Sequence, residues 1–112
     1  MSDSSLSVGF FRQAELFAAL GDETRLSLLD RLRRVNNQSI TQLADGSHLT
    51  RQAVTKHLQV LEKVQLVKSV HKGRETRYEF NPTTIESLKQ YLDLVSGQWE
   101  KKLHDLKVYL EE

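Results

Sequence analysis

The sequence predicts a mainly α-helical domain with one small β-hairpin. Apolar residues recur at helical spacing in four places, within residues 10–35, 39–45, 50–63 and 82–110. Two short strand-like runs, 66–71 and 74–80, are joined through Lys72-Gly73, where glycine permits the positive φ of a tight hairpin. A chain of 112 residues has room for one domain, and the absence of cysteine excludes disulfides.

The N-terminal part predicts a flexible segment, residues 1–9, followed by a single domain over residues 10–112. Residues 1–9 are rich in serine and lack the basic start and apolar run of a targeting signal. A first helix ends at Leu20-Gly21, and Asp22 caps a second helix that runs to about Arg34. The second helix turns these residues inward: Leu28, Leu29, Leu32 and Val35.

A short helix, a turn and a longer helix follow. Ser39 and Gln42 have capping-box spacing at the start of a helix over Ser39–Asp45, and residues 46–48 supply a turn with glycine. Thr50 is the expected N-cap of the longer helix, with Leu49 and Val54 at the spacing of a hydrophobic staple. This order is typical of a helix-turn-helix, whose second helix enters the major groove of DNA.

The longer helix, residues 50–63, has one apolar and one polar face. An ordinary solvated helix would have the same pattern, but the preceding turn and the following basic hairpin favour a recognition helix. The apolar positions are Val54, Leu58, Leu61 and Val64. The polar positions are Arg51, Gln52, Thr55, Lys56, Gln59 and Lys63, whose side chains can bond to base edges and phosphates.

The hairpin is expected to form a basic wing that packs on the helices. Between Thr50 and Arg77 there are seven basic and two acidic residues, a local charge of +5 in a chain whose total is +1. Such a concentration favours a polyanionic partner, double-stranded DNA. We expect Gln52, Thr55 and Lys56 to face base edges. Arg51 and Gln59 are expected at the groove margins, with His57 at the edge. The wing residues Lys72, Arg74 and Arg77 are expected on phosphates or in the minor groove. The alternative is a winged helix that binds a protein instead.

The last predicted helix, about residues 82–110, begins with Asn81 as N-cap and Pro82 at the first helical position. Its apolar stripe would extend about 40 Å, farther than one domain needs. We therefore expect it to pair with the first helix and with its own copy, although packing wholly within the monomer is the alternative. Trp99 is the expected anchor, with a ligand-pocket wall as its alternative role. The predicted homodimer interface contains Phe10, Phe11, Phe17, Leu92, Val95, Trp99, Leu103, Leu106 and Leu110.

Several motifs, taken in order, resemble the ArsR/SmtB family of small winged helix-turn-helix repressors. They are the runs 19–26, 42–44 and 53–61, then Leu66-Val67 and Gly73-Arg74 with Tyr78. The resemblance implies a homodimeric bacterial transcription regulator, usually a repressor that an inducer releases from an inverted-repeat operator. One departure is Gln65, where such repressors usually carry glycine after the recognition helix.

The metal sites of that family lack their ligands here. The absence of cysteine excludes the thiolate site on the helix over Ser39–Asp45. If Asp93 began the other site, the remaining positions would be Val95, Leu106 and Tyr109, which cannot complete it. The four histidines, His48, His57, His71 and His104, are scattered. We expect no metal, no cofactor and, in the absence of catalytic motifs, no enzyme activity. An unidentified small molecule or protein could still act as effector.

No apolar run is long enough for a membrane span, and a cytoplasmic location is expected.

Overall fold

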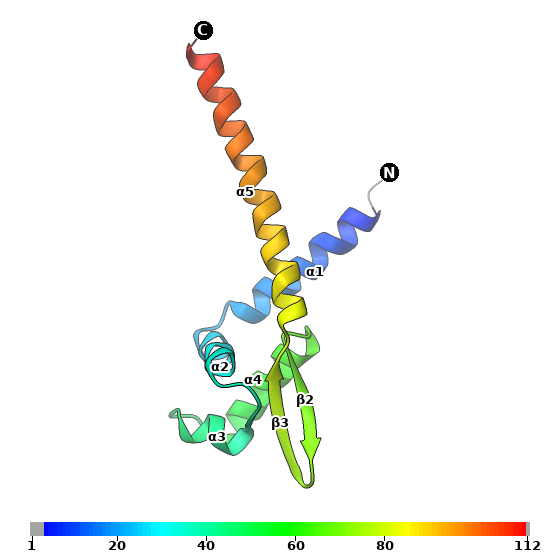
Figure 1. Ribbon diagram of the computed structural model, residues 1–112, viewed down its shortest axis with the longest axis vertical. Coiled ribbons are helices and arrows are strands. Elements are labelled where there is room, and N and C mark those ends of the chain that lie inside the picture. Colours follow the sequence, from blue (N-terminus) through cyan, green and yellow to red (C-terminus); the bar gives the residue numbers. More distant parts are fainter. Residues whose placement is uncertain (1–3, 112) are drawn as a thin grey trace.

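The computed structural model describes the backbone of residues 4–111 and the side chains of residues 11–111. At one end of the molecule, helices pack beside a small sheet whose hairpin projects at the edge, and one long helix leaves this core (Figure 1). The molecule measures 67 × 31 × 19 Å. The prediction of a mainly helical domain with a hairpin is confirmed. In chain order the elements are α1 (Ser4–Leu20), α2 (Glu23–Arg34), β1 (Gln38–Ser39), α3 (Ile40–Asp45), α4 (Arg51–Lys63), β2 (Val67–Lys72), β3 (Glu75–Phe80) and α5 (Pro82–Glu111).

The start of α1 and the end of α2 differ from the prediction. α1 begins at Ser4 and therefore includes residues that the sequence placed in a flexible segment. The Asp22 side chain caps α2 as expected by accepting from the Arg25 backbone N–H at 3.0 Å. Val35 was predicted to face inward and is 63% exposed. The reason is that α2 ends at Arg34, and Val35, its C-cap, has extended backbone and so does not continue the inward face of the helix.

The sheet has three strands in the order β1-β3-β2, because a two-residue strand that the sequence did not reveal joins the hairpin. Gln38 pairs with Tyr78 in this antiparallel contact. In the hairpin, Lys72 pairs with Glu75, so the two loop residues are Gly73 and Arg74 rather than Lys72 and Gly73. Gly73 has a φ of 65°, as predicted, and its position first in the loop is that of a type II′ turn.

One hydrophobic core holds these elements together and keeps the polar side of α4 outside. The fully buried side chains come from α1, α2, α3, α4, the residue before β2 and the start of β2: Leu16, Leu28, Leu32, Leu43, Val54, Leu58, Leu61, Leu66 and Val67. Tyr78 is buried and Phe80 packs against the core, so the wing is anchored through β3 as expected.

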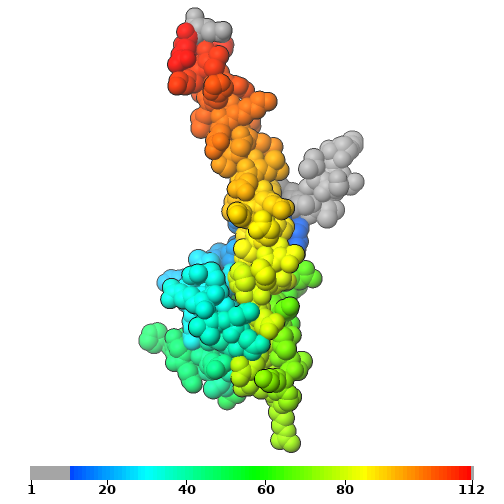
Figure 2. All heavy atoms as spheres, in the orientation of Figure 1, coloured from blue at the N-terminus to red at the C-terminus, as the bar shows by residue number. Residues whose placement is uncertain are grey.

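α5 belongs to the core only at its start. Thr84 and Leu88 are its buried residues, and beyond them the helix projects away from the rest of the molecule (Figure 2). In the described part of the chain, none of the helices combines the length and apolar character needed to cross a membrane.

Candidate nucleic-acid interface

The start of α4 is fixed by the caps that the sequence predicted. In α3, the Ser39 hydroxyl accepts from the Gln42 backbone N–H at 3.1 Å while the Gln42 side chain accepts from the Ser39 backbone N–H at 2.9 Å. Thr50 accepts from the Ala53 backbone N–H at 3.1 Å at the head of α4. These bonds satisfy backbone donors that helix starts leave unpaired, and so define where each helix of the pair begins.

The two faces of α4 are separated as expected. Val54, Leu58 and Leu61 are completely buried. On the other side, four polar side chains that the sequence assigned to DNA are exposed: Arg51, Gln52, Lys56 and Gln59. Thr55 is half-buried, and its hydroxyl donates to the Arg51 carbonyl at 2.8 Å, so that this oxygen keeps acceptor capacity for a partner.

The end of α4 uses a glutamine in the left-handed conformation. Gln65 has a φ of 65°, and its N–H donates to the Glu62 carbonyl while the Leu66 N–H donates to the Leu61 carbonyl, both at 2.9 Å. This pair of bonds is a Schellman motif, in which glycine is the usual residue. Asn81, the expected N-cap of α5, instead donates its side-chain amide to the Gln65 carbonyl at 2.9 Å.

His57 lies against α2 rather than on the open polar face. Its side chain is 25% exposed, and its Nδ1 lies 3.9 Å from the Asp22 carboxylate and 3.4 Å from Nη1 of Arg25. Arg25 also donates from Nε to the Ala19 carbonyl at 2.7 Å, at the end of α1. The sequence assigned His57 to DNA, but the structure gives it partners that position α4 on the N-terminal helices.

The wing presents two of its three predicted cations freely. Lys72 and Arg74 are exposed at the hairpin tip. Arg77 is held within the fold, where Nε donates to Glu75 at 2.9 Å and Nη1 donates to the Asn37 carbonyl at 3.0 Å. Arg77 therefore has a structural role within the fold that does not involve DNA.

Arg51 from α4 and Arg74 from the wing tip line the same open hollow, although they are far apart in the sequence. Its other walls come from the start of α3 and from β3, including the hydroxyl-bearing residues Thr41 and Thr76. Arg51 and Arg74, which come from different elements, thus line one hollow, and Glu75 lines it as well.

The residues expected at a dimer interface form an exposed apolar surface on α1 and α5. Trp99 is 60% exposed and has the Lys102 ammonium 5.6 Å from its ring centroid. Phe17 and Tyr91 make an edge contact with centroids 6.2 Å apart, which joins the two helices within the chain. Val95 is half-buried, and the side chain of Phe10 lies outside the described residues. The other exposed members are Phe11, Leu92, Leu103, Leu106 and Leu110.

Three arginines that the sequence did not single out tie the helices to one another. Arg12 donates to the Val64 carbonyl at 2.8 Å, Arg25 to Ala19, and Arg31 to Leu43 at 2.5 Å. Each neutralises part of the negative end of a helix. Over the residues whose side chains are described, no group of three or more His, Asp or Glu residues could hold a metal ion.

The chain is similar in sequence and in structure to transcription regulators. A model for a helix-turn-helix domain matches residues 20–70. The HTH-type transcriptional regulator YuzN of Bacillus subtilis is 40% identical over 80 residues, which cover 65% of this chain and 86% of that protein. An ArsR-like transcriptional regulator from Rhodococcus sp. RHA1 has a TM-score of 0.80 at 37% identity, covering 88% of this chain and 92% of its own.

A more distant structure has the same fold. The winged helix-turn-helix domain of Mb0332 from Mycobacterium bovis, described as homodimeric and DNA-binding, has a TM-score of 0.68 at 21% identity and covers 94% of this chain and 93% of its own. The Bacillus and Rhodococcus proteins are similar enough to this chain, in sequence identity and in the share of their length that is matched, to be members of the same family. The chain belongs to the ArsR-like family of winged helix-turn-helix transcriptional regulators.

Proposed function

We propose that the protein is a cytoplasmic homodimeric repressor that binds an inverted-repeat DNA operator and does not respond to metal ions. The observation that carries the proposal is the division of α4. Val54, Leu58 and Leu61 are 0% exposed, while Arg51, Gln52 and Lys56 are exposed on the opposite side. A helix held this firmly by one face can present the other to base edges in a major groove.

The apolar surface of α5 supports a dimer. Trp99, Leu103 and Leu106 are more than half exposed beyond the point where α5 leaves the core. Aromatic and aliphatic residues in one continuous stripe are typical of a buried interface. Helix-turn-helix dimers hold their two recognition helices about 34 Å apart, one turn of DNA, and so match two half-sites of an inverted repeat.

The ligand inventory supports an effector other than a metal ion. The chain has no cysteine, and the positions that would continue a site from Asp93 are occupied by Val95, Leu106 and Tyr109. Valine and leucine have no donor atom for a metal. The effector is instead an organic molecule or a protein, or the regulator responds to its own concentration.

Fluorescence titration of labelled genomic fragments at two salt concentrations tests DNA binding. Affinity should fall steeply with salt, because protein cations displace counterions from phosphates. Lys56→Ala should cost about 1 to 3 kcal/mol and relax sequence preference if Lys56 reads a base. Lys89→Ala, an exposed change of the same kind on α5, is the matched control and should leave affinity unchanged. Absence of binding to every fragment, with tight binding to a protein, would favour the protein-binding alternative.

A further inference from the structure

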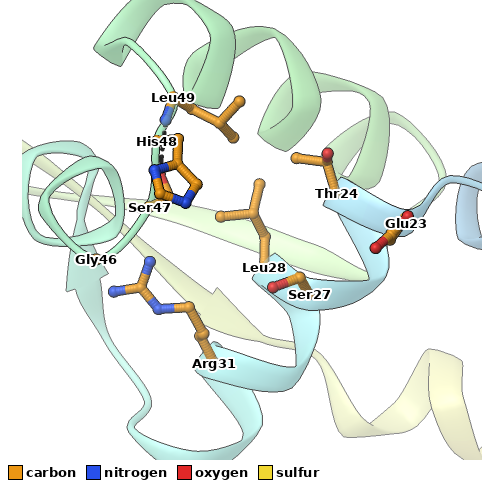
Figure 3. A pocket seen from close by; sticks show the side chains of 9 residues that line it. All are labelled: Glu23, Thr24, Ser27, Leu28, Arg31, Gly46, Ser47, His48 and Leu49. Carbon is orange, nitrogen blue, oxygen red and sulfur yellow. Dashed lines mark hydrogen bonds between the residues drawn. The ribbon is translucent and has the colours of Figure 1, made fainter.

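A pocket lies between α2 and the loop that joins α3 to α4, on a part of the molecule that none of the predicted contacts uses. Its volume is about 310 Å³. Figure 3 shows Ser27, Leu28 and Arg31 of α2 on one side and His48 and Leu49 of the loop on the other. This volume is at the lower end of the range for small-molecule sites, and holds roughly ten non-hydrogen atoms if each occupies about the 30 Å³ of a water molecule.

One end of the pocket carries the positive charge of Arg31. Arg31 donates from Nη1 to the Leu43 carbonyl at 2.5 Å and from Nη2 to the Gln42 carbonyl at 3.1 Å. Gly46 makes this possible, because a Cβ at that position would collide with the guanidinium. No ion pair in the described part of the chain involves Arg31. A guanidinium has five N–H donors, so donors remain for a carboxylate.

The other end carries a carboxylate. Glu23 lines the pocket and stands eight residues before Arg31 on α2, about 12 Å along the helix axis. Two turns of helix separate the charges too far for them to pair directly. A strongly anionic ligand would be repelled by Glu23, whereas a ligand with one amino group would be attracted to it.

The surface between the two charges combines apolar side chains with the polar residues Thr24, Ser27, Ser47 and His48. Leu28 is 2% exposed and packs into the core below the pocket, and the half-buried Leu49 contributes from the loop. Ser27 lies between Glu23 and Arg31 on the same side of α2 and adds a hydroxyl. Methylene groups suit such a floor, because they gain by leaving water.

We propose that this pocket binds a small zwitterion, with its carboxylate at Arg31, its amino group at Glu23 and a short methylene chain over Leu28 and Leu49. The same loop leads directly to Thr50, the N-cap of α4. A ligand that touches α2 and the loop together is therefore linked to the placement of α4, and by reciprocity to DNA affinity. This regulatory consequence rests on the proposed DNA binding, whereas ligand binding itself does not.

Titration of the full ¹⁵N-labelled chain with 6-aminohexanoate, followed by amide chemical shifts, tests the site without DNA. The expected result is saturable shifts at Ser27, Gly46 and Leu49, with weaker binding of hexanoate and of hexylamine, which each lack one charge. Glu23→Gln should weaken 6-aminohexanoate binding by about threefold or more, as for an exposed ion pair, and should not weaken hexanoate binding. Glu86→Gln, the same exposed change on α5, should alter neither.

Ser27→Phe gives a second test, because the ring would fill the pocket from an exposed position of α2. It should abolish the saturable shifts. The absence of such shifts in the unmodified chain, or equal binding of all three probes, would overturn the proposal.

A DNA titration at saturating 6-aminohexanoate tests the link to α4 separately. A change of about fivefold or more in DNA affinity supports that link. Unchanged DNA affinity would refute that link, and failure to bind DNA at all would refute the proposed function without affecting the pocket. Loss of DNA binding in Ser27→Phe without any probe binding to the unmodified chain would instead assign this surface to DNA.

Discussion

Arg12 in α1 donates from Nη2 to the carbonyl oxygen of Val64, 2.8 Å away, and so joins the first helix directly to the residue that ends α4. The last carbonyls of a helix lack partners within the helix and carry partial negative charge. A guanidinium both donates a hydrogen bond to such a carbonyl and places a positive charge beside it. The contact fixes the far end of α4, while Thr50 and the loop fix its beginning.

Replacement of Arg12 should therefore loosen α4 although Arg12 is remote from the predicted DNA-binding residues. Arg12→Met keeps most of the aliphatic stem and should lower the free energy of unfolding by about 1 to 2 kcal/mol, because the part-buried carbonyl loses a charged donor. Urea unfolding at a fixed protomer concentration measures this change. Arg33→Met removes a surface ion pair with Asp30 and should cost less than about 1 kcal/mol. Equal losses in both variants would argue against a special role for the Arg12 contact.

Gln65 offers a stabilising substitution. A non-glycine residue at a φ of 65° is strained by its Cβ, and glycine removes the clash. Gln65→Gly should raise the free energy of unfolding by about 1 kcal/mol. The relieved strain stabilises the folded state, and the greater entropy of the unfolded chain with glycine offsets part of this gain. Gln90→Gly, at an exposed interior position of α5, should lower it by about 1 kcal/mol. Both values follow from urea unfolding curves, and destabilisation by Gln65→Gly would contradict the strain assigned to this helix end.

Asp22 should contribute to the loss of stability in acid. The Arg25 backbone N–H and the charges of Arg25 and His57 lower the pKa of the Asp22 carboxyl below its usual 3.8. A carboxyl whose pKa is lower when folded stabilises the fold above its unfolded pKa, and the contribution disappears as pH falls through the folded pKa. Asp22→Asn keeps a capping side chain but has no charge.

The Asp22→Asn variant should therefore be less stable than the unmodified protein near neutral pH, and the difference should shrink as pH falls below about 4. Urea midpoints measured across this range test the prediction. Asp45→Asn, at the exposed end of α3, controls for the change in net charge. A difference that is constant with pH would show that the carboxylate of Asp22 adds nothing beyond its hydrogen-bonding shape.

Leu106 tests the proposed dimer surface. Leu106→Glu would place a charge from each protomer in the proposed apolar interface, and should raise the dimer dissociation constant by about a hundredfold or more. Sedimentation velocity over a range of protein concentrations measures the constant. Val35→Glu, an exposed apolar position at the end of α2, is the matched control and should leave the constant unchanged. If Leu106→Glu also left it unchanged, the stripe on α5 would not be the interface.

The local signals in the sequence were strong enough to predict most of the helices. Ser39 with Gln42 and Thr50 mark helix starts by their own hydrogen bonds, so short-range chemistry decides those boundaries. The polar face of α4 was likewise predictable, because helical periodicity alone separates it from Val54 and Leu58. β1 was missed because two residues have no periodicity, and their pairing depends on Tyr78.

The long-range contacts of charged side chains could not be predicted in the same way. Arg12 contacts a carbonyl 52 residues away, and nothing in its neighbours indicates that partner. His57 and Arg77 were assigned to DNA because they lie among DNA-facing residue types, but Arg25 and Glu75 lie beside them in the fold. Only the tertiary structure shows which cations of a basic region remain available to a partner.

Selection of bound sequences from a pool of random double-stranded DNA tests the central claim most directly. If two α4 helices of a dimer read DNA in adjacent major grooves, the enriched sequences should contain an inverted repeat whose half-site centres lie about 10 base pairs apart. Lys56→Ala should blur the preference within each half-site, as expected for a residue that reads a base. Enrichment of an unpaired half-site, or no enrichment at all from a pool that the protein binds, would contradict the proposal of a dimer that recognises its operator through α4.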